Sequence, residues 1–210
     1  MVPQSWWKKL SELGDPTLLT VGALALFMHL WLHGDRRAVA WHWAMAFGLC
    51  ISLTVASKAF GYVVGGGART TLIHSPSGHV AIATTFYGAC AMYLMRGYGR
   101  ILRIGVVTIT AIFVCMLAGS RIALNTHNLP EIGVALIIGA LCLGVFGLQL
   151  KRSPPSTDRR QLVALLLLLV VARFARVDGE AIIAYGTSSM ANISSTAANP
   201  AFVEAIRREK

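Results

Sequence analysis

The chain has 210 residues, of which 55% are hydrophobic and 13% charged, and its mean hydropathy is +0.62. This balance excludes an ordinary soluble domain and leaves room for about six membrane spans of roughly 20 residues each. The formal charge of +10 does not indicate nucleic acid as a partner, because the basic residues are scattered in loops between apolar runs. We therefore expect an all-α, polytopic transmembrane helical bundle, with residues 1–210 forming one integral membrane domain.

The chain begins with a short stretch in which apolar and charged residues fall on opposite faces of a helix. The apolar face holds Trp6, Trp7, Leu10 and Leu13, and the other face holds Lys8, Lys9 and Glu12. This pattern predicts an N-terminal amphipathic helix at the membrane interface. The stretch is too polar for the hydrophobic part of a cleavable signal peptide. Asp15-Pro16 then marks the start of the first long helix.

Six apolar runs follow and predict the spans. They cover about 17–33, 39–57, 79–96, 102–120, 130–150 and 161–177. Three of the connections, near 34–37, 96–103 and 151–160, are basic and belong in the cytoplasm by the positive-inside rule. The connections 58–78 and 121–129 then lie together on the outer face. Residues 178–210 form a polar segment whose role stays open.

Several other residues of types that can bind metal or take part in catalysis are interpreted as structural. The four cysteines lie inside apolar runs without a Cys-x-x-Cys spacing and are expected to pack rather than to bind metal or form disulfides. They are Cys50, Cys90, Cys115 and Cys142. The histidines of the first two spans and their loop are expected to be interfacial or core residues. They are His29, His33 and His42.

The first polar cluster is the segment 74–79, His-Ser-Pro-Ser-Gly-His, next to the apolar run that starts at Val80. Proline and glycine bend the chain, so Ser77 and Gly78 are expected at a helix N-terminus, where backbone N–H groups and the helix dipole favour an anion. His79 would face the same place, whereas His74 is expected to be exposed to solvent. The alternative is an ordinary helix start with an interfacial histidine. The motif alone does not distinguish this alternative from an anion-binding site.

The second polar cluster is Ser120-Arg121, followed after five residues by His127 and after three more by Glu131. Arg121 closes one apolar run, and His127 opens the next. Because Glu131 is one helical turn after His127, its carboxylate can accept a hydrogen bond from one imidazole nitrogen and make the other more basic. A histidine held in this way is a base or a nucleophile. The alternative is a plain interfacial ion pair of Glu131 with Arg121.

Two further cations lie near the first cluster. Lys58 ends the second apolar run, and Arg69 follows the three glycines at 65–67. With Arg121 they would bring three positive charges to one region, and the glycines would let the loop fold close over a ligand. The alternative is a flexible loop whose long cationic side chains reach along the interface.

Together, Pro76-Ser77-Gly78-His79 and Ser120-Arg121-x5-His127-x3-Glu131 resemble the second and third signatures of the type 2 phosphatidic acid phosphatase family. That family is related to vanadium-dependent haloperoxidases and bacterial class A acid phosphatases. The order of the motifs, their separation by two spans and their outer-face placement all match. The resemblance covers about residues 55–150, and it implies an all-α bundle with the active site at the outer boundary between membrane and water.

The resemblance also implies a role for each matching residue. His127 would attack phosphorus and form a phosphohistidine, and His79 would act as general acid on the leaving lipid oxygen. The non-bridging oxygens would be held by Ser77, the backbone of Gly78, Arg121, Lys58 and Arg69. No metal or other cofactor is expected, because these cations supply the charge neutralisation that phosphoryl transfer needs.

Two features depart from the family pattern. The family usually places the lysine and arginine of its first signature seven residues apart and follows the arginine with proline. Here Arg69 is eleven residues after Lys58 and is followed by Thr70. Glu131 also stands where an aspartate is usual, although one extra methylene still lets the carboxylate reach His127.

The sequence therefore predicts a lipid phosphate phosphatase in a bacterial cytoplasmic membrane, with its active site on the outer face and with a lipid phosphate and membrane lipids as its partners. Candidate substrates are undecaprenyl diphosphate, phosphatidic acid, phosphatidylglycerol phosphate and the phosphate of a lipid A. Two alternatives stay open. One is a phosphotransferase that passes the phosphohistidine to another lipid. The other is a transporter or flippase, against which the near absence of ionisable residues within the spans argues.

Overall fold

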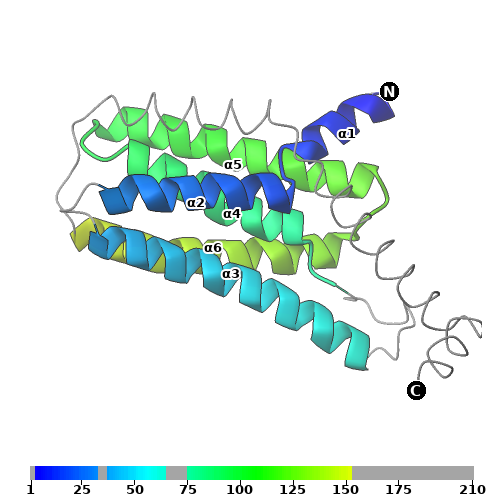
Figure 1. Ribbon diagram of the computed structural model, residues 1–210. Helices are drawn as coiled ribbons and strands as arrows, with labels where there is room; N and C mark the ends of the chain where they lie inside the picture. Colours follow the sequence, from blue (N-terminus) through cyan, green and yellow to red (C-terminus); the bar gives the residue numbers. More distant parts are fainter. Residues whose placement is uncertain (1–2, 33–36, 65–74, 153–210) are drawn as a thin grey trace, which may run out of the picture. The chain divides into compact units, whose positions relative to one another are not determined.

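The computed structural model describes residues 3–32, 37–64 and 75–152, and all regular secondary structure in these ranges is α-helical. The helices are α1 (Gln4–Glu12), α2 (Pro16–Leu32), α3 (Arg37–Val64), α4 (Gly78–Leu94), α5 (Arg100–Ala123) and α6 (Leu129–Arg152). The five long helices run lengthwise beside one another, and α4 contacts each of the other four (Figure 1). The predicted all-α class is confirmed for the described residues.

Four helical segments are long and apolar enough to cross a membrane. They are Gln4–Leu32, Arg37–Phe60, Arg100–Ala123 and Leu129–Arg152. Large apolar side chains such as Ile104, Ile109 and Ile112 are exposed along α5, as expected of a helix that faces lipid. These features are those of a membrane protein.

The number of spans stays a prediction. The run predicted at 79–96 is α4, which has 17 residues and is shorter than the four segments that meet the length of a span. The run predicted at 161–177, the polar segment 178–210, and the residues His33, Arg69 and His74 all lie outside the described residues.

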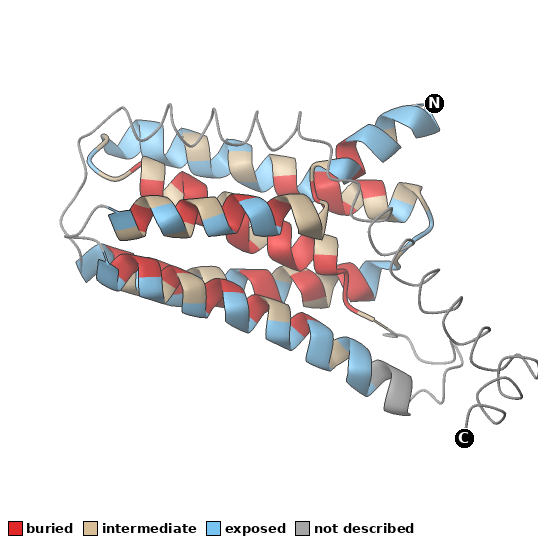
Figure 2. Cartoon of the chain, in the orientation of Figure 1, coloured by how far each residue is buried: buried red, intermediate tan, exposed pale blue. Residues whose placement is uncertain are grey.

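Helix α4 forms the centre of the bundle and is buried along most of its length (Figure 2). Glycines of α6 allow this helix to approach α4 closely. A Cβ atom added to Gly139 would lie 2.7 Å from the carbonyl oxygen of Ala81 and 2.6 Å from Cβ of Thr84. Small residues at such contacts let helix backbones pack tightly in membranes. Because the first polar cluster begins α4 and Glu131 is in α6, this contact sets the spacing between the two clusters.

We expect Gly139→Ala to destabilise the protein by about 1–3 kcal/mol, because the added methyl group has no room and must push α4 and α6 apart. Gly144→Ala is the matched control on the same helix, since a Cβ atom there would meet nothing within 4 Å. Thermal unfolding in detergent, followed by circular dichroism, measures both. Equal melting temperatures for the two variants would contradict the close contact.

A tryptophan in α3 links the helices in the half of the bundle that is far from the polar clusters. Trp43 is 1% exposed, and its indole Nε1 donates a hydrogen bond to the carbonyl oxygen of Ala23 in α2 at 2.9 Å. Its ring also packs against Phe86 of α4 and Phe146 of α6. A buried indole N–H needs an acceptor, and here the neighbouring helix supplies it. This contact network holds four helices in register.

Helix α1 occurs where the sequence predicts an amphipathic helix, and it packs against α5. Leu10 and Ser11 are buried in this contact, whereas Lys8 and Lys9 are exposed. The buried side of α1 therefore lies against α5. Whether α1 also lies in the membrane interface stays a prediction.

The turn between α1 and α2 is held in place at both ends. Oδ1 of Asp15 accepts hydrogen bonds from the backbone N–H groups of Thr17 and Leu18, at 2.8 and 3.1 Å, which confirms the predicted helix start. The hydroxyl of Tyr87 in α4 donates to the carbonyl oxygen of Leu13 at 2.7 Å. The turn is thus fixed to the central helix.

Candidate active site

The two polar clusters lie at the same end of the bundle, where α4 and α6 begin and α3 and α5 end (Figure 1). They are in direct contact, because the backbone N–H of Ser75 donates a hydrogen bond to Oε1 of Glu131 at 3.1 Å. This bond joins residues 56 positions apart in the chain. The segment before α4 and the first turn of α6 therefore form one site.

His127 and Glu131 make the contact that their spacing predicts. Nδ1 of His127 lies 2.9 Å from Oε2 of Glu131, whose residue is 7% exposed. When Nδ1 carries the proton and donates it to the carboxylate, the lone pair of the imidazole is on Nε2, on the other side of the ring. This arrangement makes Nε2 the nitrogen available for chemistry.

Glu131 also caps the helix to which it belongs. The backbone N–H of Glu131 donates to Oδ1 of Asn128 at 3.0 Å, and the N–H of Asn128 donates to Oε2 of Glu131 at 3.3 Å. This reciprocal pair is a capping box, in which a glutamate side chain at the third helical position reaches back to the N-cap residue. The capping box gives a physical reason for glutamate where the family usually has aspartate.

The turn that carries His127 is closed onto the end of α5. Asn125 has a φ of 54°, in the left-handed region. Its N–H donates to the carbonyl oxygen of Ile122 at 2.9 Å, and the N–H of Thr126 donates to the carbonyl oxygen of Arg121 at 3.0 Å. These are the two bonds of a Schellman motif. The backbone of Arg121 and that of His127 are thus held at a fixed separation.

Ser77 and Gly78 lie at the N-terminus of α4, as predicted. The side chain of Ser77 is fully buried, and its Oγ makes no hydrogen bond to any described residue. A buried hydroxyl without a partner costs free energy, so Oγ of Ser77 is a group that a polar ligand at this place would satisfy. The N–H groups and dipole of the helix N-terminus favour an anion at this place.

Lys58 stands beside this helix start. A Cβ atom added to Gly78 would lie 4.0 Å from Nζ of Lys58 and 3.4 Å from a methyl carbon of Thr54. Helix α3 continues through Val64, so Lys58 lies within the helix and not in the loop that follows it. Its ammonium group therefore adds a positive charge next to the Gly78 backbone.

His79 is the second residue of α4, at the end of the bundle and outside the four segments long enough to span a membrane. Burial and, next in size, the charge of Arg121 lower the pKa of its imidazole, the charge of Asp15 raises it, and the net pKa is about 4. His127 and Lys58 also lower it. His79 is therefore neutral at pH 7 in the absence of a ligand. A bound phosphate dianion would favour its protonated form.

Arg121 lies in the last turn of α5, and its side chain reaches α1. Its Nη1 donates a hydrogen bond to Oγ of Ser11 at 2.6 Å. A guanidinium group has five N–H donors in a planar fork, a geometry that suits the binding of an anion. The guanidinium is thus held close enough to His79 for its charge to act on that imidazole, as the charges of His127 and Lys58 also do.

The structure brings together seven of the eight residues predicted for the site, and Arg69 is outside the described residues. The seven are Lys58, Ser77, Gly78, His79, Arg121, His127 and Glu131. Ser11 and Asp15, which interact with Arg121 and His79, were not predicted from the sequence. Asp15 carries a helix-cap signal that explains it completely, and a single serine on a helix gives no signal.

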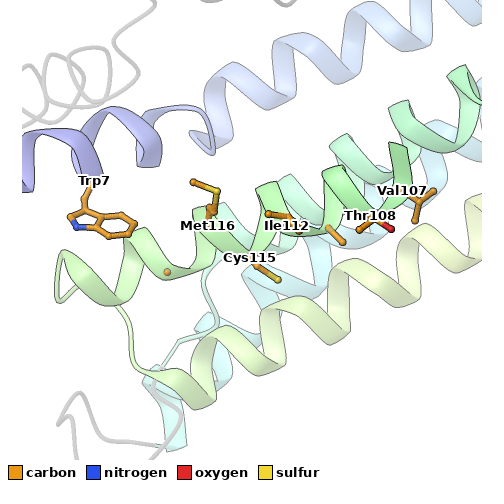
Figure 3. Close-up of a pocket in the computed structure, with 8 residues that line it drawn as sticks. Trp7, Val107, Thr108, Ile112, Cys115 and Met116 are labelled. Carbon is orange, nitrogen blue, oxygen red and sulfur yellow. The ribbon is translucent and has the colours of Figure 1, made fainter. Parts of the chain in front are cut away.

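A shallow groove of about 600 Å³ runs along α5 toward Trp7 of α1 (Figure 3). Its lining is almost entirely apolar. Besides Trp7 it consists of Val107, Thr108, Ala111, Ile112, Cys115, Met116 and Gly119. None of the seven site residues lines it. The groove is therefore distinct from the candidate active site and belongs to the outward face of α5.

The fold and the site define a helical membrane protein with a buried serine at a helix N-terminus and a histidine–carboxylate pair at one end of the bundle. A model of the PAP2 superfamily matches residues 60–154. Over 148 residues, the chain is 30% identical to a protein of Klebsiella pneumoniae described as an uncharacterized 22.5 kDa protein in the cps region. The match covers 70% of this chain and 71% of that protein. No solved structure matches the chain.

The chain belongs to the PAP2 superfamily, as the resemblance predicted. Members of this superfamily are phosphatases, and this chain is accordingly a phosphoric ester hydrolase.

Proposed function

We propose that this phosphatase acts on a lipid phosphate or diphosphate through a phosphohistidine formed at Nε2 of His127. The observation that carries the proposal is the joining of the two clusters, in which Glu131 binds both His127 and the segment that leads into Ser77. The apolar helices that frame this end of the bundle support a substrate held in the membrane.

In the first half of the proposed reaction, the phosphate oxygens bind to the hydroxyl of Ser77, the N–H of Gly78, the guanidinium of Arg121 and the ammonium of Lys58. Nε2 of His127 attacks phosphorus, and the bond from phosphorus to the lipid oxygen breaks. Protonated His79 gives its proton to that oxygen. Glu131 stabilises the positive charge that develops on the imidazole of His127.

In the second half, a water molecule attacks phosphorus and the bond from phosphorus to His127 breaks. His79 is now neutral and takes the proton from the water. Inorganic phosphate leaves, and His127 regains its lone pair. The cations stabilise the equatorial oxygens in both halves, so the proposal assigns no step to a metal or another cofactor.

We place the site on the outer face of a bacterial cytoplasmic membrane. Arg100 and Arg103 at the start of α5, and Lys151 and Arg152 at the end of α6, lie at the opposite end of the bundle from the site (Figure 1). Basic residues at span ends favour the cytoplasmic side. This charge asymmetry supports an outward-facing active site.

The proposal is tested with purified protein in detergent micelles and in lipid vesicles. We expect release of inorganic phosphate from at least one of phosphatidic acid, phosphatidylglycerol phosphate, undecaprenyl diphosphate or a lipid A phosphate, inhibition by vanadate, and full activity in a chelator. If no member of the panel loses phosphate, the lipid phosphatase proposal fails. If the phosphate moves to a second lipid and not to water, the protein is a phosphotransferase that uses the same histidine.

A further inference from the structure

The N-terminal segment contacts the candidate site, although it lies outside residues 60–154 matched by the family model. Ser11 accepts the hydrogen bond from Nη1 of Arg121 at 2.6 Å. A Cβ atom added to Gly14 would lie 3.8 Å from Cβ of His79, so the turn after α1 packs against the helix that bears this histidine. The segment around Ser11 therefore forms a wall of the site.

Ser11 is placed on the buried side of α1. It is 6% exposed and lies next to the buried Leu10, where α1 packs against α5. The bond from Tyr87 to the carbonyl of Leu13 fixes the end of the helix to α4. A short, part-buried hydrogen bond from a charged donor is of the stronger kind, and its acceptor is held by two helix contacts.

An arginine that must bind phosphate gains from such a fixed partner. The side chain has high rotamer entropy, and ordering it when the ligand arrives would weaken binding. An acceptor that already holds one N–H group of the fork keeps the guanidinium in place before the ligand arrives. Catalysis by charge stabilisation depends on this preorganisation.

We propose that Ser11 is a positioning residue of the phosphate site, which holds the guanidinium of Arg121 so that the N-terminal helix is part of the catalytic unit. The proposal rests on the proposed function in that Arg121 binds a phosphate group. It adds to that function a required side chain from outside the matched family region.

The test compares Ser11→Thr with Ser11→Val, two variants of nearly equal shape of which only the first keeps a hydroxyl. We expect Ser11→Thr to retain activity within about threefold and Ser11→Val to lose about 10- to 100-fold in kcat/KM for a lipid phosphate, as for the loss of one charge-assisted hydrogen bond. Inhibition by vanadate should weaken by a similar factor in Ser11→Val alone. The melting temperature of each variant checks the fold.

Two further variants separate positioning from general damage. Thr110→Ala removes a hydroxyl that donates to the carbonyl oxygen of Val106 within α5, away from the described site residues, so it should leave activity unchanged. Arg121→Lys keeps the charge but lacks the planar fork. If Ser11 acts through Arg121, adding Ser11→Val to Arg121→Lys should cost less than about threefold, because the bond is already lost.

Each outcome decides the proposal. If the wild type releases phosphate and Ser11→Val keeps full activity and full vanadate inhibition, the positioning role is wrong and the phosphatase function stands. If the wild type releases no phosphate from any lipid, direct titration with vanadate replaces the assay. Weaker vanadate binding by Ser11→Val than by Ser11→Thr then supports the role of Ser11, and equal or absent binding overturns it.

Discussion

Replacing His127 with alanine is expected to reduce phosphate release by a factor on the order of 10⁴ to 10⁶, since the proposed reaction has no other nucleophile. The imidazole is the group that forms the bond to phosphorus, and Glu131 orients it through Nδ1. Alanine leaves the phosphate cradle of Ser77, Gly78 and Arg121 in place. Binding of vanadate should therefore weaken far less than the rate.

The intermediate itself provides a second measurement. A lipid labelled with ³²P in its phosphate should leave a base-stable, acid-labile label on the wild-type protein after rapid quenching and none on His127→Ala. His42→Ala is a matched control, because His42 is a histidine of α3 whose Nδ1 contacts the carbonyl of Ala38 in the same helix. Its activity should be that of the wild type. Substantial turnover by His127→Ala would show that another group attacks phosphorus.

The parts of the site that depend on local sequence were predictable. Glu131 lies one helical turn from His127, so a contact between them needs only the helix start that Asn128 and Pro130 indicate. Pro76 and Gly78 similarly mark the turn that places Ser77 at the N-terminus of α4. In each case the interacting groups are at most a few residues apart, and the backbone geometry of a helix start determines their separation.

The parts that depend on packing were not predictable to the same degree. The contact of Ser11 with Arg121 spans 110 positions in the chain and exists only because α1 lies on α5. Lys58 was expected near the end of a span, where it lies, but the position of its ammonium group beside Gly78 depends on the packing of α3 against α4. Helix packing does not follow from the spacing of residues.

Glu131 combines contacts that follow from local sequence with a contact that depends on packing. The sequence alone presents the glutamate as a departure from the family pattern. In the structure the same carboxylate binds His127, caps α6 at Asn128 and receives the N–H of Ser75. A side chain with three such partners orients the proposed nucleophile, caps the helix that follows this histidine and holds the segment before α4.

Replacing His79 with glutamine is expected to reduce the rate by about 10²- to 10⁴-fold for a lipid phosphate, the usual contribution of a general acid. The alkoxide of a lipid alcohol is a poor leaving group and needs the proton that His79 supplies. p-Nitrophenyl phosphate has a good leaving group and needs no proton. The loss should therefore be much smaller with this substrate, and a leaving-group comparison separates acid catalysis from damage to the phosphate cradle.

The charges around His79 add a condition to this role. Because burial and the charge of Arg121 hold its pKa near 4, the free enzyme at pH 7 carries the neutral imidazole, which cannot donate a proton to the leaving oxygen. The phosphate dianion and the carboxylate of Asp15 both raise the pKa, so the proton must be taken up when the substrate binds. Asp15→Asn removes one of these two charges and should lower the rate with lipid phosphate more than with p-nitrophenyl phosphate, as His79→Gln does. Equal losses on both substrates for His79→Gln would instead make His79 a binding residue, and the leaving oxygen would then receive its proton from water.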